Sequence, residues 1–408
     1  MLKKRKKQIG VGGMVVTPLH KRLVAQVLDS GRFSYGPFLK RFEGEFARRH
    51  QRRFAVSTNS GTSALIAALA ALKKIDGWKD GDEVIVPALT FIATSNAVLH
   101  NGLWPVFADV DPRTFHINPE EVEKHITKRT RAIMPVHLWG VSAEMRPIMN
   151  IARRHGLRVV EDSCQTLGVA HRGAPVGSQG DIACFSTYVS HIVTTGEGGM
   201  LLTNDPQVAV YARSLISHGR DNIYMAADDD RGLSGERLRE VMGRRFQFVT
   251  AGFNYRATEI GGALGVAEFE RLEKNLATRQ RNAGQLLKGL APFAEYLQLP
   301  WWLAHSEHSF MMFPIAVKSR KFSRDEMTHY LETWSVETRP MYPLLSQPVY
   351  KKLFGNIAGQ YPVATFAQKN GFFIGCHPEL GKPETDYVIA VFREFFRGNG
   401  LAPVSGVA

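Results

Sequence analysis

The sequence lacks several features that would place it in other protein classes. No run of eighteen or more apolar residues occurs, so no membrane span is expected. The cysteines are only three, Cys164, Cys184 and Cys376, and they form no C-x-x-C pair, so we expect neither a disulfide framework nor a metal site. Lysine is missing between Lys128 and Lys274. No side chain in that long stretch can therefore form an imine with an aldehyde.

The charge of the chain does not by itself indicate a nucleic-acid partner. The formal net charge is +13, but five positive charges lie in one run at residues 3–7, which we expect to be a solvated tail, and 13 − 5 leaves +8 for the rest. No nucleic-acid motif accompanies this charge, so we expect no nucleic-acid binding, and the surplus would suit a phosphorylated substrate. The N-terminus lacks the apolar run of a secretory signal, which predicts a cytoplasmic protein.

Short β-rich runs alternate with helical segments from residue 54 onward. Strands are expected at residues 54–59, 83–87, 106–110, 132–137, 158–161, 182–186 and 200–203, with helices at 63–72, 93–100 and 147–155. Strands that alternate with helices are typical of a mostly parallel sheet covered on both faces. The sequence therefore predicts an α/β protein with three αβα layers.

The remainder of the chain divides into segments of different character. Residues 221–247 are polar, with an acidic run at 228–230, and we interpret them as an insertion or loop over an active site. A long helix at 257–287 would join two domains, a large one at 20–275 and a smaller α+β domain at 276–408. These boundaries are expectations from the pattern of elements.

Three groups of residues are candidates for a ligand site. Ser60-Gly61-Thr62 lies between a strand and a helix, where backbone N–H groups favour phosphate, although any such connection also favours glycine and a capping hydroxyl. Asp162 follows an apolar strand, and it is either a helix cap or the partner of a protonated ring nitrogen. Ser186 ends another strand, and His191 follows before a glycine cluster at 196–199, which is either a ligand-binding turn or an ordinary one.

Taken together, these groups resemble one protein family. The matching stretches are residues 59–65 (NSGTSAL), 87–91 (PALTF), 137–140 (HLWG), 161–165 (EDSCQ), 196–199 (GEGG) and 252–256 (GFNYR). Their order is similar to that of the DegT/DnrJ/EryC1/StrS sugar aminotransferases, a fold-type I group that depends on pyridoxal 5′-phosphate. The resemblance runs from about residue 20 to 395.

The resemblance implies roles for individual residues. Gly61, Thr62 and Ser186 would hold the cofactor phosphate, with Asn254 contributed by the partner of a homodimer. Phe91 would stack on the pyridine ring, Asp162 would pair with the ring nitrogen, and Gln165 would lie near the ring hydroxyl. As weaker assignments, His218 would contact substrate, and Arg256 or Arg339 would bind the carboxylate of L-glutamate as amino donor.

One position departs from the family pattern. Family members carry the lysine that binds the cofactor five residues before the first glycine of the GEGG stretch, and here that residue is His191. An imidazole forms no imine, so pyridoxal phosphate or its amine form, pyridoxamine 5′-phosphate, would be held without a covalent bond. Histidine is nevertheless well suited to moving protons.

The substitution resembles that of the 4-keto-6-deoxyhexose 3-dehydratases of the same family, which carry histidine at this position. The resemblance therefore implies a nucleotide-sugar dehydratase. One branch of that group uses an iron–sulfur cluster, which three distant cysteines cannot bind, so regeneration of the cofactor by glutamate is expected. Two alternatives stay open at this point: a sugar aminotransferase that tolerates histidine, and a non-catalytic relative that binds the cofactor.

Overall fold

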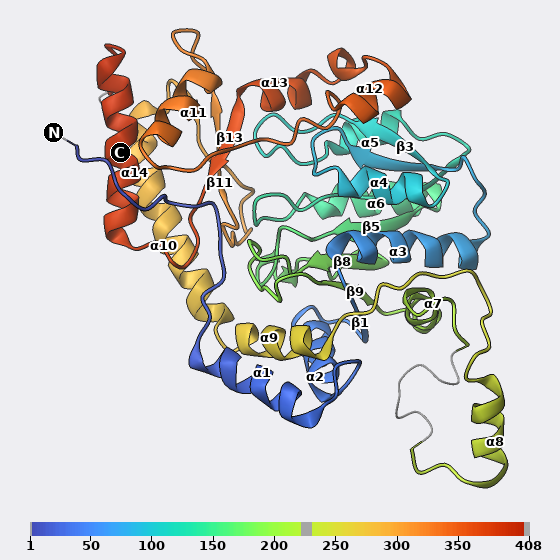
Figure 1. Ribbon diagram of the computed structural model, residues 1–408. Coiled ribbons are helices and arrows are strands. Elements are labelled where there is room, and N and C mark those ends of the chain that lie inside the picture. Colours follow the sequence, from blue (N-terminus) through green and yellow to red (C-terminus); the bar gives the residue numbers. More distant parts are fainter. Residues whose placement is uncertain (1, 222–230, 404–408) are drawn as a thin grey trace.

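The computed structural model describes residues 2–221 and 231–403 (Figure 1). A large sheet lies at its centre, with strand order β1-β9-β8-β5-β4-β2-β3. Every strand pair from β8 to β3 is parallel, whereas β9 lies antiparallel between β1 and β8. The strands are β1 (Phe54–Thr58), β2 (Glu83–Pro87), β3 (Trp104–Ala108), β4 (Thr130–Ile133), β5 (Arg158–Asp162), β8 (Ile182–Ser186) and β9 (Gly199–Thr203).

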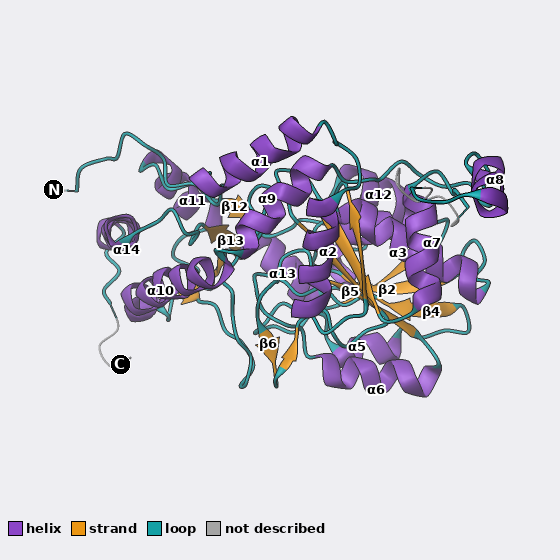
Figure 2. Cartoon of the chain, turned by 90° about the horizontal axis from the view of Figure 1, so that it is seen from below, coloured by secondary structure: helices purple, strands orange, loops and turns teal. Residues whose placement is uncertain are grey.

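Helices cover both faces of the large sheet, as Figure 2 shows. α3 (Gly61–Asp76), α4 (Ala93–His100) and α7 (Pro206–Ile216) lie on one face, and α5 (Pro119–Lys124) and α6 (Met145–His155) lie on the other. Parallel strands that are buried on both faces need apolar side chains throughout, and all five residues of β2 are buried. The predicted three-layer α/β fold is confirmed.

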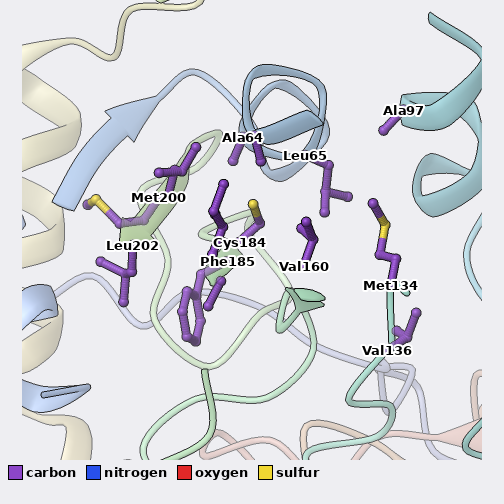
Figure 3. Packing of buried hydrophobic residues seen from close by; sticks show 14 of the residues in the cluster. Ala64, Leu65, Ala97, Met134, Val136, Val160, Cys184, Phe185, Met200 and Leu202 are labelled. Carbon is purple, nitrogen blue, oxygen red and sulfur yellow. The ribbon is translucent and has the colours of Figure 1, made fainter. Parts of the chain in front are cut away.

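The main core lies between α3 and the sheet. Ten of the sixteen residues of α3 are buried, because α4 and α7 flank the helix while the sheet lies beneath it. Figure 3 shows Ala64 and Leu65 of α3 above Val160 of β5 and Phe185 of β8. Burial of this kind stabilises the fold by about 25 cal/mol for each Å² of apolar surface removed from water. The helix start that carries Gly61 is thereby fixed against the strand ends.

A second, smaller sheet has its own core. Its order is β10-β11-β13-β12, and α10 and α14 pack together beside it. The elements are α10 (Leu272–Leu290), β10 (Leu297–Gln298), β11 (Phe313–Val317), α11 (Arg324–Thr333), β12 (Arg339–Pro340), β13 (Gly371–Ile374) and α14 (Lys382–Gly398), with the short helices η1 (Ala291–Phe293) and η2 (Ala358–Gln360). α12 (Pro348–Phe354) packs on the large domain, since Tyr350 Oη donates to Ser95 Oγ of α4 at 2.7 Å and Phe354 meets Phe107 of β3. α13 (Pro362–Asn370) contacts both parts, because it packs against β11 and β13 while Ala364 N donates to Asp109 at 2.9 Å. The division at 275/276 stays a prediction.

The N-terminal segment is bound to the smaller sheet. Ile9 N donates to Ser335 O at 2.8 Å, and Glu337 N donates to Ile9 O at 2.9 Å, so Ile9 extends the sheet edge. Arg5 forms an ion pair with Glu384 at 2.7 Å, whereas the four lysines at positions 3, 4, 6 and 7 are all exposed. The expected solvated tail is therefore wrong at Arg5, because its guanidinium has a carboxylate partner.

Further along the chain, Gly12 brings the N-terminal segment to the loop that follows β8. A Cβ on Gly12 would lie 2.8 Å from the Cβ of Ser190. The remaining elements are α1 (Pro18–Ser30), α2 (Pro37–Arg49), β6 (Ala170–His171), β7 (Ala174–Pro175), α8 (Gly235–Arg244) and α9 (Glu259–Phe269). None of the described helices combines the length and apolar character needed to span a bilayer.

Two expectations about the middle of the chain need correction. The single helix expected at 257–287 is two helices, α9 and α10, because the chain turns at Arg271, whose guanidinium donates to Val15 O at 3.0 Å. Residues 221–247 contain α8, which Figures 1 and 2 place beyond α7 at one edge of the molecule. This helix therefore does not lie over the β8 loop of its own chain. The acidic run at 228–230 lies outside the described residues.

Candidate active site

The candidate site lies at the carboxyl edge of the large sheet, where β1, β5 and β8 end. Thr58, Asp162 and Ser186 are the last residues of these strands. In an open α/β sheet, ligands bind at the carboxyl ends of the strands. The sequence places Asp162 and Ser186 24 positions apart, and the β5–β8 pairing brings Asp162 opposite Cys184.

Gly61 allows the start of α3 to approach β8 closely. A Cβ at this position would lie 2.7 Å from the Cβ of Ser186 and 2.8 Å from Cys164 Sγ, so any larger residue would push the helix away. Ser60 caps the helix by accepting a hydrogen bond from Ser63 N at 3.0 Å. The side chain of Thr62, the second residue of α3, is half-buried. Gly61, Thr62 and Ser186 are thus brought together at a helix N-terminus, where an anion is favoured.

Asp162 is a buried carboxylate in a polar surrounding. Its Oδ2 accepts from Thr94 Oγ1 at 2.7 Å, and its Oδ1 accepts from Cys164 N at 3.2 Å. Burial raises the pKa of Asp162, while these two hydrogen bonds oppose that shift. Among the residues that the structure describes, no lysine, arginine or histidine forms an ion pair with it. The carboxylate is therefore suited to receive a cationic group from a ligand.

His191 lies in the loop after β8, and one of its ring nitrogens is bound to that loop. Its Nδ1 lies 3.2 Å from Ser186 O. A carbonyl oxygen can only accept, so Nδ1 carries the proton and Nε2 is left with its lone pair. The pKa of His191 is lowered to about 4, mainly by burial and also by the positive charge of Arg279, whereas the hydrogen bond to the Ser186 carbonyl opposes the shift. His191 is therefore neutral at physiological pH.

Gln165 and Phe91 contact a residue that the sequence did not single out. Gln165 Nε2 donates to Tyr342 Oη at 2.7 Å, and the Phe91 ring meets the Tyr342 ring edge-on at 6.0 Å. Phe91 is 54% exposed, so its ring is open to a ligand or a partner. Tyr342 lies 177 positions after Gln165, and no local signal in the sequence predicts that contact.

Four other predicted residues lie on the surface, and within the described chain no side-chain hydrogen bond or ion pair joins them to Gly61, Asp162 or Ser186. His218, Asn254 and Arg256 are exposed, and Ser217 pairs with Asn254 as an isolated bridge. The main-chain oxygen of Asn254 accepts from Asn59 Nδ2 at 3.5 Å, so its backbone lies near the Ser60 turn. Arg339 is half-exposed and forms an ion pair with Glu337. Their roles stay predictions.

A second histidine motif of the sequence has a structural role. His137 Nε2 lies 3.0 Å from Glu161 Oε2, and Glu161 also pairs with Arg52 at 3.4 Å. Glu161 accepts main-chain hydrogen bonds from Gly177, Gln179 and Gly180 as well. These partners hold the pKa of Glu161 below its usual value despite complete burial. These hydrogen bonds and ion pairs of Glu161 hold the end of β5 in place, and Asp162 is the next residue of that strand.

Comparison with known proteins gives this geometry a family. The model of the DegT/DnrJ/EryC1/StrS aminotransferase family matches residues 16–393. The chain belongs to this family. The resemblance expected from the motifs is confirmed over almost the whole sequence, and with it the assignment of the chain to a family of nucleotide-sugar enzymes that use pyridoxal phosphate.

Relatives within the DegT/DnrJ/EryC1/StrS family include enzymes of two kinds. A GDP-perosamine synthase from Caulobacter vibrioides is 37% identical over 88% of this chain and 90% of its own length. The E. coli GDP-4-keto-6-deoxy-D-mannose-3-dehydratase, solved with bound hydrated pyridoxal phosphate, superimposes with a TM-score of 0.85 at 26% identity, over 96% of this chain and 99% of that chain. An aminotransferase from Psychrobacter cryohalolentis gives 0.86 at 29% identity, over 95% and 99%.

Five histidines with lowered pKa values predict a steep loss of stability in acid. Burial lowers the pKa values of five histidines to about 4 or about 3: His50, His116, His191, His308 and His377. The unfolded chain therefore binds protons below pH 6.5 that the folded chain refuses until about pH 4, so stability falls as pH falls through this window. Each of the five histidines differs by close to one bound proton between the two states near pH 5, so the free energy of unfolding should drop by about 6 kcal/mol per pH unit there.

Urea unfolding followed at pH 7.5, 6.5, 5.5 and 5.0 measures this slope. His50 donates from Nδ1 to Phe46 O at 2.9 Å, and a glutamine amide can replace that donor. His50→Gln should therefore reduce the slope by roughly 1 kcal/mol per pH unit. His329→Gln, at an exposed histidine, is the control and should leave the slope unchanged. A wild-type free energy that stays constant between pH 7 and pH 5 would contradict the prediction.

Proposed function

We propose that this protein is a 3-dehydratase of nucleotide-linked 4-keto-6-deoxy sugars. Its cofactor is pyridoxal 5′-phosphate, working as pyridoxamine 5′-phosphate. The observation that supports this reaction most strongly is His191, which stands where the family carries its lysine and leaves Nε2 unprotonated. The absence of lysine between Lys128 and Lys274 leaves no other residue of that stretch to bind the cofactor covalently.

The residues at the sheet edge fit the cofactor. Gly61, Thr62 and Ser186 form a close-packed helix start that suits a phosphate. The unpaired, buried carboxylate of Asp162 suits a protonated ring nitrogen, and the exposed face of Phe91 suits an aromatic ring. Gln165 would lie near the ring hydroxyl. Asn254, exposed in one chain, would reach the phosphate of the partner site in a homodimer.

When bound, the cofactor supplies an amine for the keto carbon and a ring that accepts electrons. Asp162 keeps the ring nitrogen protonated, which makes the ring a stronger electron sink. His191 accepts a proton at Nε2 from the reacting carbon and returns it to the hydroxyl group that leaves the neighbouring sugar carbon. The group departs as water, so the sugar loses oxygen and gains no nitrogen. Hydrolysis would then free the product as a ketone and release the nitrogen as ammonia, without the help of a lysine.

The amine of the cofactor is restored by an amino donor, for which we propose L-glutamate. Arg256 is exposed and would bind a carboxylate of the donor. Arg339 would do so only after its ion pair with Glu337 opens. His218, exposed on the turn before Gly219, is proposed to contact substrate.

Amination of the sugar is the second candidate reaction. It is supported by the 37% identity with the GDP-perosamine synthase of Caulobacter vibrioides, a higher identity than that of the dehydratase structure. The same substrate class would then gain an amino group at the keto carbon. Release of an aminated product without a lysine would be slow, because imine exchange with the enzyme is impossible.

One incubation separates the two reactions. The purified protein is mixed with pyridoxamine phosphate, glutamate and a panel of nucleotide-linked 4-keto-6-deoxy sugars, and the products are weighed by mass spectrometry. Dehydration gives a product that has lost one oxygen atom, whereas amination gives one that has gained nitrogen. If only aminated sugars form from every substrate of the panel, the proposed dehydratase activity is rejected. A protein heated before mixing is the control.

A further inference from the structure

Trp139 has a backbone conformation that aims its N–H group at the site. Its φ of 64° lies in the left-handed region, which is uncommon for a bulky residue. The segment 309–311 of the same chain holds this turn in place, because Met311 N donates to Trp139 O at 3.1 Å and Ser309 N donates to Gly140 O at 2.7 Å. A Cβ on Gly140 would lie 2.7 Å from Met311 N, so the two segments are in close contact. The direction of the Trp139 N–H is therefore fixed.

This N–H group determines which way the Gln165 amide faces. Trp139 N donates to Gln165 Oε1 at 3.2 Å, and a main-chain N–H can only donate. The amide nitrogen of Gln165 must then lie on the other side, where it donates to Tyr342 Oη at 2.7 Å. One of the two hydrogens on Gln165 Nε2 is used by Tyr342, and the second stays available for a ligand.

Tyr342 is held as firmly as the amide that it contacts. Its ring stacks on Trp139 with a centroid distance of 5.3 Å and an interplanar angle of 5°. Burial raises the pKa of Tyr342, so its hydroxyl stays neutral and its oxygen remains an acceptor of ordinary strength. The hydroxyl proton faces only a weak acceptor, Met312 Sδ at 3.8 Å. The oxygen therefore serves mainly to accept from Gln165.

We infer that Tyr342 is a positioning residue that holds Gln165 so that its second N–H donates to the ring hydroxyl of the cofactor. The inference rests on the cofactor named under the proposed function, but not on whether the reaction is dehydration or amination. A donor at that oxygen favours its ionised form. Tyr342 thereby lowers the pH at which the ring hydroxyl of bound pyridoxal phosphate loses its proton.

Tyr342→Phe tests this role, because it removes the hydroxyl and keeps the stack on Trp139. The pH midpoint of the absorbance of bound pyridoxal phosphate should rise by roughly half a unit. The cofactor Kd, measured by fluorescence quenching, should rise about three- to tenfold. Tyr387→Phe is the matched control, since it removes a hydroxyl of α14 that donates to Trp334 O at 2.8 Å, at the end of α11. The control should shift neither quantity.

A double substitution shows whether Tyr342 acts through Gln165. In a Gln165→Met background, Tyr342→Phe should add no further shift of the midpoint, because the positioned donor is already absent. Two results would overturn the inference for a wild-type protein that binds the cofactor. One is that the midpoint shifts of the two substitutions add up, and the other is that Tyr342→Phe has the midpoint of wild type. Failure of wild type to bind pyridoxal phosphate would instead reject the proposed function and this inference with it.

A second substitution guards against a folding defect. If Tyr342→Phe does not accumulate as folded protein, 3-fluorotyrosine is placed at position 342. It keeps the ring and the hydroxyl but makes the oxygen a weaker acceptor, so the midpoint should rise in the same direction by a smaller amount. An unchanged midpoint in that protein would also overturn the inference.

Discussion

His191→Lys should yield a protein that forms a covalent link to pyridoxal phosphate and no longer deoxygenates the sugar. The new primary amine can condense with the aldehyde of the cofactor, which the imidazole of wild type cannot do. Loss of a positioned proton carrier lowers rates by about 10²- to 10⁴-fold. Borohydride reduction followed by peptide mass spectrometry locates the link, and product analysis gives the rate.

His191→Gln separates the loss of the proton carrier from the gain of the amine. Glutamine can donate to Ser186 O as His191 Nδ1 does, but it carries no base and no amine. It should lose deoxygenation without gaining a reducible link. A wild-type protein that is itself labelled by borohydride and cofactor, at any side chain, would contradict the mechanism. Unchanged dehydration in His191→Lys would reject His191 as the proton carrier.

Asp162→Asn should weaken cofactor binding strongly and yet stabilise the cofactor-free protein at neutral pH. The asparagine keeps the acceptor for Thr94 but provides no charge for a ring nitrogen, a loss of about 2–5 kcal/mol for a buried charge pair. Burial raises the pKa of Asp162, so ionisation above that pKa costs stability in the empty protein. The neutral amide removes that cost, and stability should rise relative to wild type as pH increases.

Glu161→Gln is the matched control, because the adjacent carboxylate has the opposite shift. Its partners lower the folded pKa of Glu161, so its charge contributes stability above pH 4.5 that is lost as pH falls through the folded value. Glu161→Gln should therefore destabilise the cofactor-free protein, whereas Asp162→Asn should not. Calorimetry of the two empty variants at pH 7.5, with a cofactor titration of each, measures both effects. Equal cofactor affinity in wild type and Asp162→Asn would reject Asp162 as the ring partner.

The sequence predicted the parts of the site that lie at the ends of neighbouring strands. Asp162 and Ser186 end β5 and β8, and Gly61 begins the helix after β1, so local patterns together with the rule for parallel sheets bring all three to one edge. The strand bounds were close, as at residues 182–186, although β4 ends at Ile133 and not at 137. Beyond Ile133 the pairing continues only as an isolated bridge between Val136 and Asp162.

Contacts between distant segments could not be predicted from the sequence. Tyr342 stacks on Trp139 and bonds to Gln165, although no periodicity links these positions. The break between α9 and α10 likewise depends on Arg271 reaching Val15 O, a contact made only after folding. The basic N-terminus shows the same limit, since its composition suggested a free tail while Glu384 near the other end of the chain binds Arg5.

The attachment of Ile9 beside Ser335 has a consequence for biosynthesis. Ile9 emerges from the ribosome first, but its pairing partners are made more than three hundred residues later. Until then, these hydrogen bonds cannot help to hold Gly12 of the same segment beside Ser190, in the loop that carries His191. The nascent large sheet can assemble early, whereas its reactive edge is finished only when nearly the entire polypeptide has been translated.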